Sequence, residues 1–168
     1  GQRGDGVAID PEWLRDDHAG LFAIAGRHSL AGRLALAGRD DLAEAQLAQW
    51  RRVFGDDLHL ELTRTGRDGD EVFNRFALHA AGKLGLPVVA SNDVRFLAGD
   101  DFDAHEARVC IASGDVLHDP RRPHAYSAEQ YLKSEDAMCA LFADLPEALE
   151  NSVELARRCN IELEFGKN

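Results

Sequence analysis

The chain has 168 residues, of which 45% are hydrophobic and 29% are charged, a composition typical of one soluble globular domain. No stretch approaches the ~20 apolar residues that a membrane-spanning helix needs. Nineteen Lys and Arg against 30 Asp and Glu give a formal net charge of -11. Because sequence-independent binding of nucleic acid neutralises phosphates with basic residues, this balance argues against direct DNA binding by the chain.

The three cysteines, Cys110, Cys139 and Cys159, are widely spaced and contain no C-x-x-C pair. This odd set fits neither a disulfide framework nor a zinc knuckle, so we expect a reducing cytoplasmic compartment and cysteines packed on helix faces. The polar, Gly-rich first residues lack the pattern of a secretion signal. Because the chain does not begin with Met and its sole Met is Met138, we expect a piece of a longer polypeptide.

The first half of the chain predicts three helices and two strands. A short helix opens with Asp10 at the N-cap and Pro11 at the first helical position. The apolar run 21–25 lies between glycines and is typical of a strand buried on both faces. A helix over 30–36 follows, and then a longer one that begins at Asp40 and ends at Gly55. Residues 57–62 alternate polar and apolar with the period of two that indicates a strand.

The second half continues the alternation of helices and strands. Residues 70–84 form an amphipathic helix, and 86–90 form a third buried strand with Pro87 at its entry. We expect a helix over 100–112 and a loop over 113–126. Ser134 and Asp144 each begin a helix, and 161–165 could form a terminal strand. The inner face of the helix 70–84 comprises Val72, Phe73, Phe76, Ala77, Ala80, Ala81 and Leu84.

This alternation predicts an α/β fold with a mostly parallel sheet or a β/α barrel. Three strands are too few to close a barrel, so we expect only part of one. In such folds functional side chains lie just beyond the carboxyl ends of the strands. That rule selects Gly26–Ser29, Thr63–Arg67 and Ser91–Arg95, which we expect to converge at one rim.

Asp93 and Arg95 are the sharpest candidates among these residues. They are two positions apart, so in extended backbone both side chains point the same way. An Asp at this position can be a metal ligand or a general base. The residues alone favour the other role, in which Asp93 caps the next turn or pairs with the adjacent Arg.

Other chemical motifs are scarce. The seven histidines show no H-x-H or H-E-x-x-H spacing, so they predict no self-contained metal site. His28 follows the first strand and has the best position, whereas His105 is expected to be a surface or capping residue. No nucleophile elbow, Walker-type loop or dinucleotide fingerprint occurs. Arg121–Arg122 could touch phosphate, but a solvated role is more common on an acidic protein.

Four stretches of the chain resemble one family closely. They are LPVVASNDVRF (86–96), DFDAHEARV (101–109), LFADLPEALENS (141–152) and ELARRCN (154–160). They are similar to the polymerase-and-histidinol-phosphatase (PHP) domain of bacterial replicative DNA polymerases, the DNA polymerase III alpha-subunit family. The resemblance runs in order from about Asp10 to Lys167. It implies a distorted TIM-like β/α barrel, of which residues 1–168 are the later, C-terminal portion. The earlier part of the PHP domain and the polymerase palm, fingers and thumb would lie outside this chain.

The resemblance also implies a vestigial metal site at Asp93, Arg95 and Arg27. In many members, histidines and acidic residues on one rim hold metal ions and support phosphoester hydrolysis. Asp93 matches a ligand in the family motif Asn-Asp-Val-His, but Arg95 stands where that motif has His, and Arg27 stands where many members have Cys. A guanidinium cannot coordinate a metal. We therefore expect no catalytic residue and no cofactor in this chain. The two arginines would replace the ion, pairing with Asp93 and with acidic residues outside the chain.

The function that the resemblance implies is that of a segment of a DNA-directed DNA polymerase, a nucleotidyltransferase of chromosomal replication that uses Mg²⁺. The segment itself would be a non-catalytic structural and docking module. Its partners would be the rest of the polymerase and the proofreading exonuclease (epsilon) subunit, with DNA contacted only through the parent protein and no membrane. The alternative is a metal-dependent phosphoesterase or 3'-5' exonuclease domain with Zn or Mn, which Arg27 and Arg95 disfavour.

Overall fold

A parallel sheet of three strands forms the centre of the protein in a computed structural model that describes residues 13–161 and 166. The strands are β1 (Ala23–Ala25), β2 (Leu58–Thr63) and β3 (Val88–Ser91). The helices are α1 (Trp13–Asp16), α2 (Leu30–Leu36), α3 (Asp40–Phe54), α4 (Asp70–Leu84), α5 (Phe102–Ser113), α6 (Glu135–Leu141) and α7 (Pro146–Arg158), with short 3₁₀ turns η1 (Gly55–Asp57) and η2 (Gly99–Asp101).

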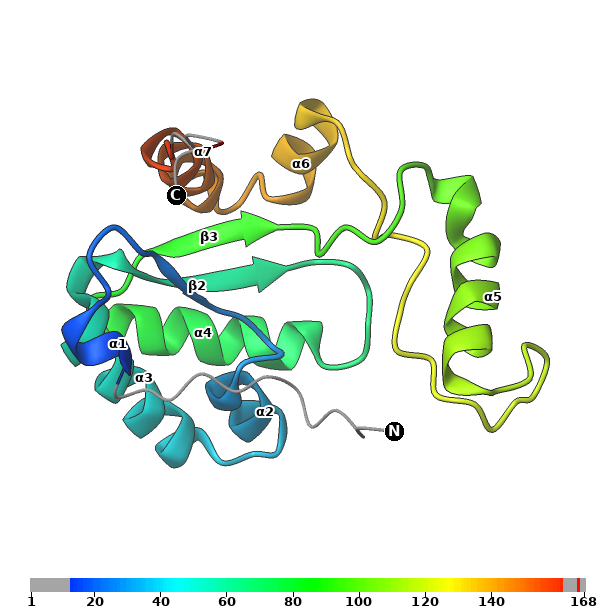
Figure 1. The fold of residues 1–168 in the computed structure, drawn as a ribbon, viewed down its shortest axis with the longest axis horizontal. Coiled ribbons are helices and arrows are strands. Elements are labelled where there is room, and N and C mark those ends of the chain that lie inside the picture. Colours follow the sequence, from blue (N-terminus) through cyan, green and yellow to red (C-terminus); the bar gives the residue numbers. More distant parts are fainter. Residues whose placement is uncertain (1–12, 162–165, 167–168) are drawn as a thin grey trace.

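The strand order is β1-β2-β3, and both pairings are parallel. Ala25 lies opposite Leu60, and Leu60 opposite Val88, so the three carboxyl ends reach the same edge of the sheet. Helices α2, α3 and α4 lie on one side of the sheet and α7 on the other (Figure 1). The described sheet is open, and the α/β class expected from the alternation of elements is confirmed.

Helix α4 shows how the sequence builds this core. Its apolar residues recur at spacings of three and four, which places them on one helical face. Gly85 ends the helix in a left-handed conformation (φ 61°), and its N–H donates to the carbonyl of Ala81. The buried apolar side of α4 comprises Phe73, Phe76, Ala77, Ala80 and Ala81. Val72, predicted to face inward, is half exposed instead, since its position lies on the solvent side of the helix.

The strands are present where the sequence predicts them, but their burial differs. Strand β1 was expected to be buried on both faces, and this was wrong, because Ile24 is about half exposed. β1 lies at an edge of the described sheet and has a neighbouring strand on one side only. Strand β2 lies between the other two, so even its polar His59 is buried, with its ring 6.2 Å from that of Phe22.

The predicted helices are confirmed with small shifts at their ends. Ser134 caps α6 by accepting a hydrogen bond from the N–H of Ala137, whereas α7 begins at Pro146, two residues after the predicted Asp144. The predicted start at Asp10–Pro11 and most of the terminal strand 161–165 lie outside the described residues. Of the cysteines, Cys110 is buried in a helix face as expected, but Cys139 and Cys159 are exposed. None of the described helices is long and apolar enough to cross a membrane.

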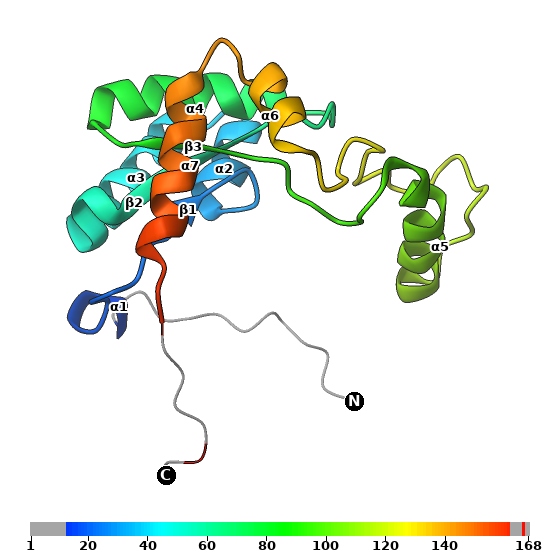
Figure 2. The same cartoon turned by 90° about the horizontal axis from the view of Figure 1, so that it is seen from above.

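Residues 97–126, which we name the α5 arm, stand apart from the sheet and its helices (Figures 1 and 2). The arm has a small interior of its own. His105 is largely buried, with its ring 5.4 Å from Phe96 and 4.7 Å from Tyr126, and Arg122 forms an ion pair of 2.6 Å with buried Glu106. The surface role expected for His105 and the solvated role expected for Arg122 were therefore wrong. Residues distant in sequence cover both side chains.

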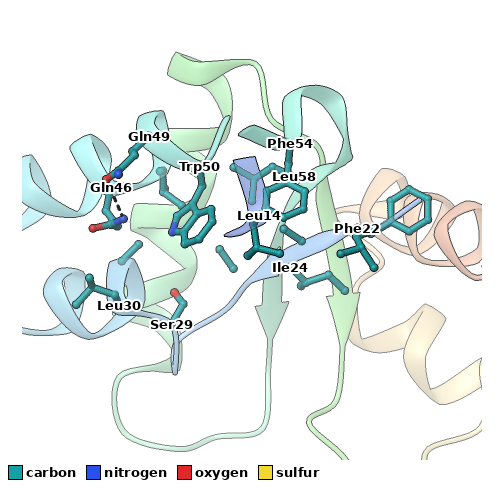
Figure 3. Close-up of a pocket in the computed structure, with 15 residues that line it drawn as sticks. Leu14, Phe22, Ile24, Ser29, Leu30, Gln46, Gln49, Trp50, Phe54 and Leu58 are labelled. Carbon is teal, nitrogen blue, oxygen red and sulfur yellow. Dashed lines mark hydrogen bonds between the residues drawn. The ribbon is translucent and has the colours of Figure 1, made fainter. Parts of the chain in front are cut away.

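An apolar cavity of about 610 Å³ lies beside β1. Figure 3 shows Leu14, Ile24, Leu30 and Trp50 around it, from α1, β1, α2 and α3. The remainder of the lining is also mostly apolar. The outer side of β1 therefore joins a hydrophobic hollow that the described residues leave open.

The contrast between Phe73 and Val72 gives a test of the core. Phe73 is fully buried, so Phe73→Ala should lower the free energy of unfolding by about 3–5 kcal/mol. Val72→Ala, the matched control one residue away, should change it by no more than about 0.5 kcal/mol. Urea denaturation followed by circular dichroism measures both, and equal losses would contradict the burial described here.

Candidate functional site

The three segments selected from the sequence meet at the carboxyl ends of the strands, a region that we call the rim. Gly26–Ser29 follows β1, Thr63–Arg67 contains the end of β2, and Ser91–Arg95 contains the end of β3. Arg27 pairs with Asp70 at the start of α4, and Arg67 pairs with Asp93 across the sheet. The expectation that these segments converge is confirmed.

Asp70 is the most deeply buried carboxylate of the rim, with a side chain only 2% exposed. Its Oδ2 accepts hydrogen bonds from the Thr65 N–H at 2.9 Å and the Thr65 hydroxyl at 2.7 Å. Its Oδ1 pairs with the Arg27 guanidinium, and Nη2 of Arg67 lies 3.7 Å away. Asp70 is also the first residue of α4, where the helix dipole favours negative charge.

These contacts set the ionisation of Asp70. Burial by itself raises the pKa of this carboxyl group, because it disfavours the charged form. The hydrogen bonds from Thr65 and the nearby guanidinium groups of Arg67 and Arg27 outweigh burial, so the pKa of Asp70 lies below its ordinary value. The rim thus holds a buried, ionised carboxylate at neutral pH.

Asp93 is held by two arginines and a glutamine. Its Oδ2 accepts from Arg67 Nη1 at 2.6 Å and from Gln130 Nε2 at 3.0 Å, and its Oδ1 lies 2.8 Å from Arg95 Nη2. The His28 ring nitrogen Nε2 is 3.7 Å from the same carboxylate. Every strong contact of the Asp93 carboxylate is therefore with a side chain that donates hydrogen bonds.

The backbone at Asp93 differs from the extended form assumed in the sequence analysis. Strand β3 ends at Ser91, and Asp93 has a φ of 41° in the left-handed region. Asp93 and Arg95 nevertheless meet, with Arg95 Nη2 2.8 Å from Oδ1 of Asp93. Of the two roles left open for Asp93, pairing with the adjacent Arg is the one present.

Arg67 connects the two carboxylates; the sequence places it in the rim segment Thr63–Arg67 but does not indicate this role. Its side chain is only 4% exposed; Nη1 binds Asp93, Nε donates to the Thr65 hydroxyl at 2.9 Å, and Nη2 faces Asp70. Asp70 is the rim residue that the sequence reasoning missed, because there it is only the first residue of the predicted helix 70–84. A signal was available, since Asp70 directly follows the connection between β2 and α4 that contains Arg67 at the expected rim.

Arg27 and Arg95 both lie at the rim, but on different carboxylates. Arg95 binds Asp93, as expected, and stacks over the ring of Tyr126 at 5.4 Å. Arg27 instead binds Asp70 and donates to the carbonyl of Asp68 at 2.8 Å. The acidic partner of Arg27 therefore belongs to this chain, which corrects the expectation that Arg27 pairs with acidic residues outside it.

Gln130 attaches residues 127–132 to the rim. Fully buried, it donates to the carbonyl of Asp93 at 2.9 Å as well as to its carboxylate, and its own oxygen accepts from the Ser127 N–H. Asn92 donates at 2.8 Å to the carbonyls of Glu129 and Tyr131. The rim therefore anchors the chain that returns from the α5 arm.

The chemistry of this arrangement is that of an ion-pair network. Its acids are held by Arg27, Arg67 and Arg95, whose guanidinium groups cannot coordinate a metal. Within the described residues, no three His, Cys, Asp or Glu side chains are grouped so as to hold a metal ion. The network can fix the three strand-end segments relative to one another.

Comparison with known proteins gives a consistent picture, although no family model matches the chain. The chain is 66% identical over 161 residues to DNA polymerase III subunit alpha of Xylella fastidiosa, which covers 96% of this chain and 14% of that protein. It is 47% identical over 168 residues to the same subunit of Pseudomonas aeruginosa and 48% identical over 170 residues to that of Escherichia coli. Each of these matches covers 99% of the chain. The chain thus corresponds to a segment of DNA polymerase III alpha subunits and spans 14–15% of their length.

The lowered pKa of Asp70 generates a prediction about stability. Above the pKa of an unfolded Asp, about 3.9, the ionised carboxylate contributes its full stabilisation, which is lost as pH falls through the lower folded-state pKa. Asp70→Asn leaves buried guanidinium groups without their acid, so it should lower the free energy of unfolding at pH 7 by about 3–5 kcal/mol. The difference in the free energy of unfolding between wild type and Asp70→Asn should become smaller below about pH 4.

Asp119→Asn is the matched control, because Asp119 pairs with Arg121 at 2.9 Å on the surface of the loop 114–126. Solvent screens such a pair, so the control should unfold at the same urea concentration as wild type at every pH. Urea titrations between pH 2.5 and 8 measure all three proteins. A pH-independent gap for Asp70→Asn would contradict an ionised Asp70.

Proposed function

We propose that this chain is the later part of a PHP domain in a DNA polymerase III alpha subunit and that it serves there as a non-catalytic structural and docking module. The parent protein would be the DNA-directed DNA polymerase of chromosomal replication, a cytoplasmic nucleotidyltransferase that uses Mg²⁺. The segment's high identity to alpha subunits over nearly its whole length supports this parent.

The observation that carries the non-catalytic role is the pairing of both rim carboxylates with arginines. Asp93, which the family resemblance identifies as a ligand position, binds Arg67 and Arg95. Asp70 binds Arg27. A permanent cation beside each acid supplies the charge balance that a metal would otherwise give, but it provides no Lewis acid and activates no water.

The residues of the rim do not fit a zinc or manganese ion. Asp93 and His28 are chemically suitable ligands, but Arg27 and Arg95 stand at the other two positions that the resemblance assigns to ligands. Arg67 also occupies the carboxylate face of Asp93 at 2.6 Å. We therefore derive no hydrolytic step at this rim, and the phosphoesterase alternative becomes an outcome of the test below.

The open side of β1 supports a partial barrel. The exposed Ile24 and the apolar cavity beside it would be covered by the earlier part of the same domain, since parallel sheets are normally buried on both faces (Figure 3). The remainder of the polymerase would thus be one partner of this segment. The proofreading exonuclease subunit would be the second, and DNA would be contacted only through the parent.

Metal content and hydrolysis of the full-length subunit test the non-catalytic role. We expect wild type to purify with far less than one Zn or Mn per chain and to release no nucleotide from a DNA 3' end. Replacing Arg27→Cys together with Arg95→His should increase the zinc bound, because both changes supply ligands beside Asp93 and His28. The control pair Arg52→Cys and Arg75→His makes the same replacements on exposed helix positions and should bind no more zinc than wild type.

Stoichiometric metal in wild type, with hydrolysis abolished by Asp93→Asn, would overturn the proposal and favour the phosphoesterase. Equal zinc uptake by the rim variant and the control pair would contradict a lost ligand set at these positions. Mass spectrometry of the metals and release of a labelled 3' nucleotide are the two measurements.

A further inference from the structure

The stretch LFADLPEALENS (141–152) carries part of the family resemblance but contributes no residue to the carboxylate network of the rim. It comprises the end of α6, the turn after it and the first half of α7. Arg64, which follows β2, binds the carboxylate of Asp144 in that turn at 2.5 and 2.8 Å and donates to the carbonyl of Leu141 at 2.7 Å. The stretch is thus fixed to the end of β2, and its last residues lie at β3.

Strand β3 has a free edge, since among the described strands it pairs with β2 alone. The N–H of Leu60 in β2 donates to the carbonyl of Pro87 at 2.9 Å, so the backbone of Pro87 faces β2. Successive residues of a strand turn their backbone groups to alternate sides, and Val88 and Ala90 therefore direct their N–H and C=O groups away from β2. These are the groups that a further strand would use.

Side chains of α7 bind this edge instead. Asn151 Nδ2 donates to the carbonyl of Val88 at 2.9 Å. The Ser152 hydroxyl lies 2.8 Å from the carbonyl oxygen of Ala90 and shares its hydrogen with the carbonyl of Ala148 at 2.9 Å. Figure 1 shows α7 next to β3, on the side away from β2. Two consecutive residues of one helix thus satisfy the two carbonyls that point out of the sheet.

Helix α7 is also fixed along its length, so it does not swing aside to admit a strand. Near its start, Ala148 is fully buried in the core that contains Val88. At its end, Arg158 pairs with Asp57 at 2.8 Å just before β2, and its guanidinium lies 4.5 Å from the centre of the Phe22 ring. The middle of the helix, with Asn151 and Ser152, is held between these two attachments.

We infer that α7 takes the place of a strand at β3, so that the parallel sheet of the parent protein ends there and no other segment pairs with this edge. Asn151 and Ser152 are the residues that close it. The barrel of the parent is then open at β3, since a barrel closed by hydrogen bonds leaves no free strand edge. The earlier part of the domain would join this sheet at β1 alone, a step that rests on the proposed function.

Hydrogen–deuterium exchange of the full-length polymerase subunit tests this closure. Asn151→Asp keeps the size of the side chain but removes the donor, and Ser152→Ala removes the hydroxyl. Each should speed exchange of the amides of Val88 and Ala90 about tenfold or more, because α7 alone covers them and each change leaves a carbonyl without its donor. The amides of β2 should exchange as in wild type, since they lie one strand further in.

Matched substitutions away from the edge are the controls. Asn160→Asp changes an exposed residue beyond α7, and Ser113→Ala removes a hydroxyl that bonds within and just after α5. Both should leave the exchange of β3 unchanged. Ser152→Thr keeps a hydroxyl at the edge and should restore the slow exchange that Ser152→Ala loses.

Unchanged exchange of β3 in both edge variants would show that another segment covers this edge and would overturn the inference. An equal rise in β2 and β3 would overturn it as well, because α7 would then support the whole sheet and not its edge. In wild type, we expect slow exchange at Ala23–Ala25, where the earlier part of the domain would join. Rapid exchange there would contradict the partial barrel of the proposed function and leave the closure at β3 intact.

Discussion

The structure depends on the pairing of two carboxylates, buried Asp70 and partly buried Asp93, with arginines at the carboxyl end of a parallel sheet. Arg67 is the central member, since it binds Asp93 directly and faces Asp70 at 3.7 Å while its side chain is 4% exposed. A buried charge without a partner costs several kcal/mol, on the order of 3–5 when one partner is removed. Each strand-end segment therefore depends on the others to keep its position, because each supplies a charge that another segment neutralises.

The same network determines where the α5 arm begins. Asp93 and Asn92 hold the residues that return from the arm, Asp93 through buried Gln130 and Asn92 through two backbone carbonyls. A bridge between Phe96 and Tyr131 continues this attachment. Under the proposed function, the rim holds the strand-end segments in place and does not hydrolyse a substrate. The permanent guanidinium cations retain the charge balance of a metal site without its reactivity.

Local features of the sequence determined the elements of this protein. Apolar spacing and the following Gly85 defined α4, Ser134 defined the start of α6, and the short apolar runs located β1 and β3. The rule that functional side chains lie just beyond the carboxyl ends of parallel strands predicted the position of the rim. These predictions succeed because helix spacing, capping and strand periodicity act within about five residues along the chain.

Only the tertiary structure decided which charges meet and which surfaces stay open. Arg27 and Asp70 are 43 residues apart and Arg67 and Asp93 are 26 apart, so no local pattern identifies them as partners. The same holds for β1, whose apolar run did not reveal that it lies at an edge, and for His105, which neighbours distant in sequence bury. Burial and ion pairing depend on the packing of whole elements, whereas the sequence by itself fixes only the residues that each element presents.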